Sequence, residues 1–255
     1  MSRSIPLILL VLACHSAWGD TIRRGLGPEP DSLDIHQAQG LSAVNLLRDL
    51  REGLVTFDAH GDPAPGVAES WTLLDDGRRY RFRLRETARW SDGAPVRSGD
   101  FVYAWRRALA PASAARTAGL LGAVENAGDV MAGAAEPAML GIEAVSEREL
   151  EIRLAQPAPW FPEILAHPVS FPLPAGSAAA PRDAPVNGAF VIESMTPHAM
   201  IRLAANPEFH AAHDTGVEFV EYLPIEDSAS ELSRYRSGEL DITETIPPGR
   251  YQWLR

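Results

Sequence analysis

The stretch WSDGAPVRSGDFVYAWRR, residues 90–107, joins a tight turn to an amphipathic helix. Its first residues are rich in turn formers, and Ser98 is placed to cap a helix that runs from Gly99 to Ala110. Pro111 stops that helix, and large apolar side chains recur along it on one face. The apolar face consists of Phe101, Trp105 and Leu109. The stretch therefore predicts a helix that packs on a core directly after a surface turn.

Strand patterns lie on both sides of this stretch. Arg79–Leu84 alternates arginine with apolar side chains, which predicts a strand with one buried face, and Asp75–Gly77 predicts a tight turn before it. Further short strands are expected at Thr21–Leu26, between Leu54 and Leu84, and at Gly141–Val145, Glu149–Leu154, Asn187–Glu193, Met200–Ala204, Val217–Leu223 and Leu240–Thr243. This mixture of strands and helices favours a mixed α/β fold with two subdomains.

Other helices follow from apolar spacing and capping residues. They are Ala43–Arg51, capped by Ser42 and ended by Gly53; Pro157–Ala166, with Trp160, Phe161 and Leu165 buried; and a helix from Ser228 or Ser230 through Tyr235, ended by Gly238. The tryptophans at positions 71, 90, 105 and 160 occupy expected apolar positions. We therefore favour core packing over a ligand-stacking role for each of them.

Composition limits the function of the chain. The 255 residues can bury a sizeable core, and the net charge of -11 argues against a nucleic-acid partner, which needs a basic face. The arginines from Arg78 to Arg85 do not change this conclusion, because strand alternation turns several of them to a solvated sheet face beside acidic residues. The sequence thus indicates an acidic globular protein.

Residues 1–19 are typical of a secretory signal peptide, with a short apolar run at Ile5–Ala13 and a small-x-small cleavage pattern at Ala17–Gly19. The apolar run is about half of the roughly 20 residues that a membrane span requires. Val11–Cys14 also resembles a bacterial lipoprotein box, so lipid anchoring at Cys14 is the alternative. Both interpretations predict an exported protein, and cleavage after Gly19 leaves it without cysteine.

Motifs of the common enzyme classes are missing from the sequence. It contains no G-x-S-x-G elbow, P-loop, G-x-G-x-x-G after a strand, H-E-x-x-H or cysteine pair. His210 and His213 have a spacing that could share a metal, but Asn206–Pro207 before them indicates a turn, and solvated loop histidines are the favoured interpretation. We expect no catalytic residue, no metal site and no cofactor.

A series of motifs, in one order along nearly all of the mature chain, resembles a known family. The central ones are GVAESW (66–71), YRFRLR (80–85), WSDGAPV (90–96) and DFVYAWRR (100–107), and the outer ones are SLDIH (32–36), RDLREGL (48–54), VNGAF (186–190), NP (206–207) and RYRSGELD (234–241). The sequence is similar to the family 5 extracellular solute-binding proteins, and most closely to the periplasmic oligopeptide-binding proteins.

The resemblance implies a mixed α/β fold of the periplasmic-binding-protein type, type II, peptide-binding class. It implies a first domain formed by residues 20–51 and 169–255, with a smaller α+β domain, residues 52–168, inserted into it. In the family a peptide binds between two lobes that close like a hinged trap. The second lobe is expected to follow Arg255, so this chain is expected to be truncated before it.

The resemblance also implies binding residues. In the family, the stretch that matches residues 39–41 pairs its backbone with the peptide as an added strand, and the stretch that matches 244–245 faces the peptide. Here residues 244 and 245 depart from the usual aromatic and amide residues, and Thr117 stands where a pocket-lining tyrosine is common. The implied peptide-binding residues are Gln39, Gly40, Leu41, Thr117, Glu244 and Thr245. Ordinary strand and loop packing is the alternative for all of them.

By resemblance, the chain is expected to be a periplasmic component of an ABC peptide importer, with short peptides and the permease subunits as partners. Loss of the second lobe would impair binding, because hinge closure buries the ligand. One alternative is a single-lobe module that binds a second chain or dimerises over the uncovered face, which would then show a large apolar patch. A degraded gene product without a stable fold is another. An enzyme is not expected.

Overall fold

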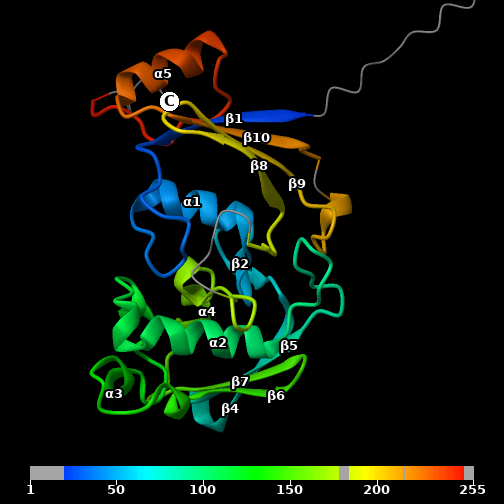
Figure 1. The fold of residues 1–255 in the computed structure, drawn as a ribbon, viewed down its shortest axis with the longest axis vertical. Helices are drawn as coiled ribbons and strands as arrows, with labels where there is room; N and C mark the ends of the chain where they lie inside the picture. Colours follow the sequence, from blue (N-terminus) through cyan, green and yellow to red (C-terminus); the bar gives the residue numbers. More distant parts are fainter. Residues whose placement is uncertain (1–19, 178–183, 215, 250–255) are drawn as a thin grey trace, which may run out of the picture.

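Two four-stranded sheets form the two ends of the molecule (Figure 1). The computed structural model describes residues 20–177, 184–214 and 216–249. The predicted signal peptide and the lipoprotein box at Cys14 lie outside the described residues. Two short strands, β2 (Val55–Phe57) and β3 (Pro63–Pro65), pair with each other between the two sheets.

The first sheet joins segments from both ends of the chain. Its order is β1 (Thr21–Gly27), β10 (Phe219–Pro224), β9 (Met200–Ala205) and β8 (Phe190–Thr196). β1 runs parallel to β10, and the other pairs are antiparallel. The buried side chains of this end are Leu26, Leu46, Leu50, Phe190, Ile201, Leu203, Val220 and Tyr222.

The second sheet is antiparallel and is formed by a continuous part of the sequence. Its order is β4 (Ala68–Leu74), β5 (Arg79–Leu84), β7 (Glu149–Arg153) and β6 (Ile142–Ser146). The alternation predicted for β5 is present, because Tyr80, Phe82 and Leu84 are buried while Arg81 and Arg83 are exposed. The turn before β5 is the 3-10 segment η1 (Asp75–Gly77), as predicted.

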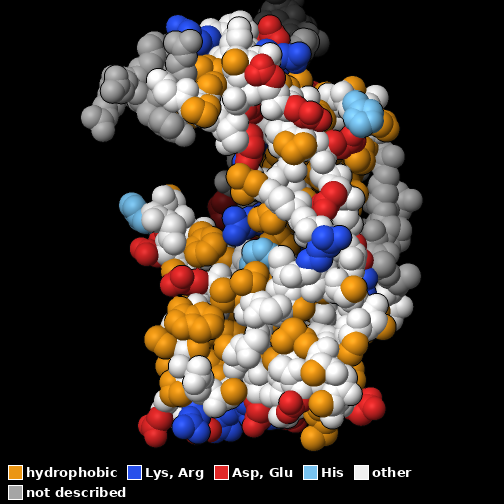
Figure 2. Space-filling model, turned by 90° about the vertical axis from the view of Figure 1, so that its left-hand side faces the viewer, with side chains coloured by type: hydrophobic (Ala, Val, Ile, Leu, Met, Phe, Trp, Pro, Cys, Tyr) orange, Lys and Arg blue, Asp and Glu red, His pale blue; other side chains and the backbone are white. Residues whose placement is uncertain are grey.

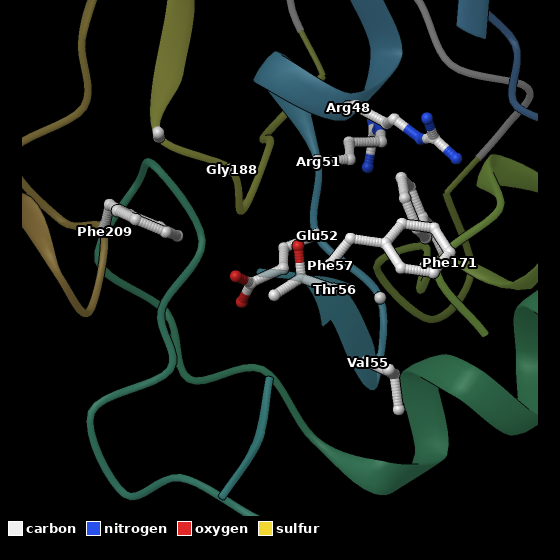
Figure 3. A pocket seen from close by; sticks show the side chains of 12 residues that line it. Arg48, Arg51, Glu52, Val55, Thr56, Phe57, Phe171, Gly188 and Phe209 are labelled. Atoms are coloured by element: carbon white, nitrogen blue, oxygen red, sulfur yellow. The ribbon is translucent and has the colours of Figure 1, made fainter. Parts of the chain in front are cut away.

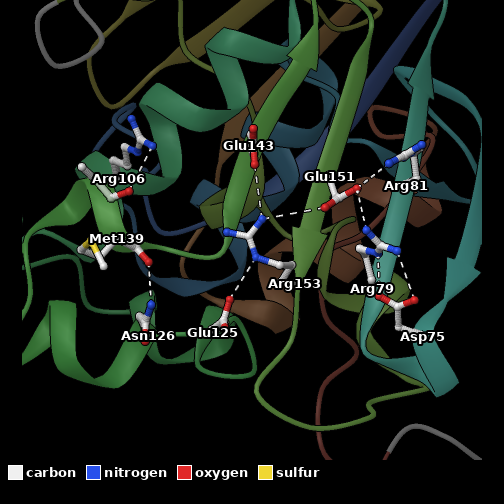
Figure 4. A network of polar contacts seen from close by, with 11 residues as sticks. Asp75, Arg79, Arg81, Arg106, Glu125, Asn126, Met139, Glu143, Glu151 and Arg153 are labelled. Atoms are coloured by element: carbon white, nitrogen blue, oxygen red, sulfur yellow. Dashed lines mark hydrogen bonds and ion pairs between the residues drawn. The ribbon is translucent and has the colours of Figure 1, made fainter.

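The outer face of the second sheet carries a network of ion pairs (Figure 4). Arg81 lies 2.7 Å from the Glu151 carboxylate, and Arg79 lies 2.8 Å from Asp75. Arg153 on the next strand bonds Glu125 at 3.0 Å. The arginines of β5 therefore form a solvated, charge-compensated sheet face, as the sequence predicts.

Five α-helices accompany the sheets in the described residues. They are α1 (Gly40–Leu50), α2 (Ser98–Leu109), α3 (Ala127–Met131), α4 (Phe161–Ile164) and α5 (Ser228–Ser237), with 3-10 segments η2 (Pro111–Ser113), η3 (Ala118–Leu121), η4 (Pro137–Met139), η5 (Pro168–Ser170) and η6 (Ala212–Asp214). α1 lies between the two ends of the molecule, and its buried leucines divide between two cores (Figure 1). Leu46 belongs to the core of the first sheet and Leu47 to that of the second. The domain boundaries at 51/52 and 168/169 stay predictions.

The helix starts and ends predicted from capping residues are partly wrong. Ser98 is the first residue of α2 and its hydroxyl bonds the Ser146 carbonyl, while the N–H of Arg97 donates to the Asp100 carboxylate at 2.8 Å. Ser42 lies inside α1, which begins at Gly40 without a side-chain cap. Ser98 thus bonds a distant segment instead of capping a helix, and Ser42 is a residue within the helix.

Gly53 does not end α1, because the helix stops at Leu50 and Arg51 is already extended. A Cβ atom at Gly53 would lie 2.2 Å from the Leu165 carbonyl oxygen, so this glycine is required for close packing of two segments. α5 begins after Asp227, whose carboxylate accepts the N–H of Ala229 at 3.0 Å. Its end at Gly238, with φ of 80°, is as predicted.

The prediction for the aromatic side chains holds except at one position. Trp90 and Trp105 are buried, Trp71 packs against the core, and Trp160 is 49% exposed. Trp160 precedes a helix of a single turn, while its neighbour Phe161 and, further on, Leu165 are buried. Among the described residues, no helix is both long and apolar enough to cross a membrane.

Candidate functional site

An open groove of about 510 Å³ lies between the end of β1, the start of α1 and the segment after α5. Its lining includes Gln39, Gly40, Leu41, Glu244 and Thr245, together with Leu26–Glu29, Asp31, Ser42 and Glu226. The structure thus brings together positions that are about 200 residues apart in the sequence. The resemblance alone predicts that these positions form a site. Peptide binding by these residues stays a prediction.

The segment that carries Glu244 and Thr245 is held along the edge of β1. The N–H of Gly25 donates to the Ile242 carbonyl at 3.0 Å, and the N–H of Asp241 donates to the Arg23 carbonyl at 2.8 Å. The predicted strand at Leu240–Thr243 is therefore reduced to a bridge between Arg24 and Ile242. This bridge places the segment that carries Glu244 and Thr245, the groove wall, beside the first sheet.

A buried carboxylate fixes the last turn of this wall. Glu231 on α5 accepts the N–H of Glu244 at 2.8 Å and that of Thr245 at 3.4 Å. Its carboxylate passes so close to β1 that a Cβ atom at Gly25 would lie 1.7 Å from its Oε1. Gly25 is therefore the residue that lets Glu231 reach the groove.

Glu244 itself is part of a buried polar network. Arg24 lies 3.1 Å from its carboxylate, and the Asn45 side chain donates to it at 2.9 Å. Tyr222, which lies under the Arg24 guanidinium, donates its hydroxyl to Asp49 at 2.6 Å. Burial raises the pKa of Asp49 above its usual value, against the hydrogen bond from Tyr222. The network ties α1, β1 and β10 to the groove wall.

Residues 39–41 differ from the expected strand. Only Gln39 is extended, with φ of -134° and ψ of 163°, while Gly40 has φ of 76° and begins α1 together with Leu41. The N–H of Gln39 is held by the Asp31 carboxylate at 3.0 Å. In this geometry the segment offers the N–H groups of a helix start rather than a strand edge.

Thr117 lies outside the groove lining. It is half-buried directly before η3, and its neighbour Arg116 reaches Gln39 with a 3.3 Å bond to Oε1. Sequence reasoning also missed the acidic residues of the groove, Glu29, Asp31 and Glu226. Glu29 and Asp31 belong to Gly27–Ser32, a stretch of turn formers that by itself predicts only a break after the first strand.

Two chain crossings at the end of α1 connect the two ends of the molecule. The side-chain amide of Asn187 donates to the Glu52 carbonyl at 2.9 Å and accepts the Glu52 N–H at 3.4 Å. The N–H of Gly188 donates to the Leu50 carbonyl at 2.9 Å. Figure 2 shows the molecule hollowed between its upper and lower parts.

A buried ion pair also joins the segment before α1 to α2. The Arg107 guanidinium donates to both oxygens of Asp34, at 3.0 and 2.5 Å, and to Nδ1 of His36 at 2.5 Å. A guanidinium can only donate, so Nδ1 is unprotonated. Burial opposes ionisation of Asp34, but the bonds from Arg107 and the His36 N–H outweigh it and hold its pKa below the usual value.

Acidification is expected to weaken folding through His36. Burial and Arg107 lower the pKa of His36 from its ordinary 6.5 to about 4, so the unfolded chain binds the proton first. Stability should therefore fall as the pH drops from 6.5 toward 4, by about 2 kcal/mol between pH 7 and pH 5. Urea unfolding at both pH values measures this.

His36→Asn keeps an acceptor for Arg107 and removes the titration, so this variant should lose much less stability over the same interval. The exposed His60 gives the control, His60→Asn, which should follow the parent. The pKa of His167 is also lowered by burial, so part of the pH dependence should remain in His36→Asn. An unchanged pH dependence in His36→Asn would contradict the assignment.

The described residues contain no group of three or more His, Cys, Asp or Glu side chains placed to hold a metal. His210 is not a solvated loop residue, as the sequence suggested, because its Nε2 lies 2.7 Å from Glu52 and its side chain is 10% exposed. The site thus offers a groove lined by backbone and carboxylate groups, with two chain crossings that join the ends of the molecule.

The model for bacterial extracellular solute-binding proteins, family 5 (middle region), matches residues 62–254, and the chain belongs to this family. It is 39% identical to the probable deoxycholate-binding periplasmic protein YgiS of Escherichia coli K12, with 84% of this chain and 42% of that protein covered. It is 38% identical to the periplasmic oligopeptide-binding protein OppA of Salmonella typhimurium, with 92% and 45% covered.

Solved structures confirm the expected fold. The unliganded open form of the murein tripeptide-binding protein MppA superposes with a TM-score of 0.87 at 34% identity, with 93% of this chain and 48% of that chain covered. Haemophilus influenzae OppA in complex with RPPGFSPFR gives 0.87 at 35% identity and the same coverage. The chain spans about half the length of these relatives, which are solute-binding proteins rather than enzymes.

Proposed function

We propose that this chain forms one wall of a periplasmic peptide site that serves an ABC importer, with short peptides as ligands and permease subunits as partners. The observation that supports the proposal is the groove, whose lining includes the positions at 39–41 and 244–245 that are expected to face a peptide. The proposal also treats the chain as exported and without enzymatic activity. OppA and MppA, whose names describe peptide binding, share this fold.

Backbone groups give the groove a means to hold any peptide. The first N–H groups of α1 have no acceptor within the helix, so they can donate to peptide carbonyls. A Cβ atom added at Gly40 would meet no other atom within 4 Å, so a peptide backbone can approach this residue closely. Recognition through the backbone requires no particular ligand side chain.

The charge of the groove favours basic peptides. Glu29, Asp31, Glu226 and Glu244 line it, and no arginine or lysine occurs among the described residues of the lining. Arg24 compensates Glu244, and the Glu29 carboxylate accepts the N–H of His198 at 3.2 Å and lies 3.0 Å from its Nδ1. The remaining carboxylates should attract ligand cations, in a chain with a net charge of -11.

Calorimetric titration with trilysine and with triglutamate tests both parts of the proposal. We expect trilysine to bind about tenfold or more tightly than triglutamate. Glu226→Gln should weaken trilysine binding about threefold, while Glu136→Gln, an exposed carboxylate outside the groove, should leave it unchanged. Equal affinity for both peptides would overturn only the charge preference.

Absence of heat with either peptide, from a chain that unfolds cooperatively, would overturn peptide binding by this chain. The single-lobe module would then be favoured, with dimerisation as its measurable consequence in sedimentation velocity. The single-lobe alternative requires a large exposed apolar patch. In the groove the exposed large apolar side chain is Leu41, at 57%, and it lies among acidic side chains, so the groove is not such a patch. The acidic lining likewise disfavours a steroid carboxylate such as deoxycholate in this groove.

A further inference from the structure

A second pocket, of about 310 Å³, lies where the end of α1 meets β2 and the turn before β8 (Figure 3). It shares no lining residue with the groove. Arg48 and Arg51 lie together on one side of it, next to Phe57 and Phe171. The pocket thus combines cationic and aromatic walls in the space between the two sheets.

The Arg51 guanidinium forms no ion pair with a carboxylate of the described residues, and it lies 5.9 Å from the centre of the Trp90 ring. Arg51 is 3% exposed, and its Nη1 has no hydrogen-bond partner among the described residues. Burial lowers the pKa of Arg51 to about 10, with Asp34 acting in the opposite direction. Asp34, however, gives both of its oxygens to Arg107. A buried cation without a bonded carboxylate is costly, so an anion placed beside it is stabilised.

Arg48 adds a second unpaired guanidinium at the mouth of the pocket. No carboxylate pairs with it in the described part of the chain, and its guanidinium lies 5.7 Å from the centre of the Phe57 ring. The acidic residue of the lining, Glu52, points away from both arginines toward Phe209 (Figure 3). Its carboxylate is occupied by His210 at 2.7 Å. The positive charges of Arg48 and Arg51 therefore remain available to a bound anion.

The aromatic side chains of the lining suit an anion that has an apolar body. Phe57 is 38% exposed, and Phe171 is 2% exposed. A pocket of this volume is at the lower end of the range for small-molecule sites. We propose that it binds a small carboxylate with an apolar or aromatic body, whose carboxylate meets Arg48 beside the charge of Arg51 and whose body packs on the phenylalanines.

Phenylacetate is a suitable probe, and calorimetry with the mature chain is the direct test. We expect saturable millimolar or tighter binding of phenylacetate and none of 2-phenylethylamine, which has a similar shape and the opposite charge. Arg48→Met keeps the aliphatic stem and should weaken binding about tenfold or more. Arg78→Met, an exposed arginine outside the pocket, should leave binding unchanged.

Two further measurements test the role of the aromatic side chains. Phe57→Leu should weaken phenylacetate binding, and inorganic phosphate should bind more weakly than phenylacetate because it lacks the apolar body. No saturable binding by the parent chain, or equal binding by parent and Arg48→Met, would overturn the proposal. Phosphate binding as tight as that of phenylacetate would overturn the role of the aromatic walls. Matching urea midpoints for both arginine variants and the parent would show that the comparison is between folded proteins.

Discussion

Trp105→Ala is expected to lower the free energy of unfolding by about 4 kcal/mol, because it removes a large side chain from a closed core. Trp105 is fully buried on α2, with its ring edge-on to Phe161 at 6.3 Å between ring centres. Its indole N–H donates to the Ser170 carbonyl at 2.8 Å. The alanine would leave both a cavity and a carbonyl without its donor.

Urea unfolding followed by circular dichroism measures this loss. Trp160→Ala is the matched control, because Trp160 is half exposed, and its cost should stay below about 1 kcal/mol. Since the chain has two cores, the transition should be followed at several wavelengths to detect separate unfolding. Similar losses for the two alanine variants would refute the described packing of α2.

Gly188→Ala is expected to destabilise the chain by about 3 kcal/mol, because it introduces a methyl group where two backbones touch. A Cβ atom at Gly188 would lie 2.5 Å from the N atom of Arg51 and 2.6 Å from the carbonyl oxygen of Asp49. Backbone atoms cannot rotate away as a side chain can, so the two crossings would be pushed apart.

Thermal and urea unfolding of Gly188→Ala against Gly128→Ala measure this effect. Gly128 lies in α3 with no atom within 4 Å of its Cβ position, so alanine there should be neutral or stabilise by up to about 1 kcal/mol. If Gly188→Ala were as stable as Gly128→Ala, the two backbones could not be in contact.

Periodicity predicted the elements well where burial follows directly from local pattern. The alternation of Arg79–Leu84 and the apolar face of α2 both appear as expected. The starts of α1 and α2 were predicted less well, because Ser42 is buried inside α1 and Ser98 bonds the distant Ser146 carbonyl. A local pattern cannot reveal that a serine has a partner elsewhere.

The site depended even more on distant contacts. The positions 39–41 and 244–245 came from the resemblance, and no local signal connects them. The local pattern around Glu231 is typical of a solvated helix residue, yet Glu231 is buried and holds Glu244 and Thr245. The sequence likewise predicts Arg51 only as the last residue of a helix, and the structure places it, 3% exposed, in the lining of a pocket.

The parallel pairing of β1 with β10 affects the order in which the fold can form. The second sheet and its core lie within residues 54–173, apart from a few contacts with residues 35–47, so this part can form before the end of the chain is in place. β1 must wait for Phe219–Pro224, with about 190 residues of chain between the partners. Until that pairing forms, the first strand has an unpaired edge that could pair with another chain.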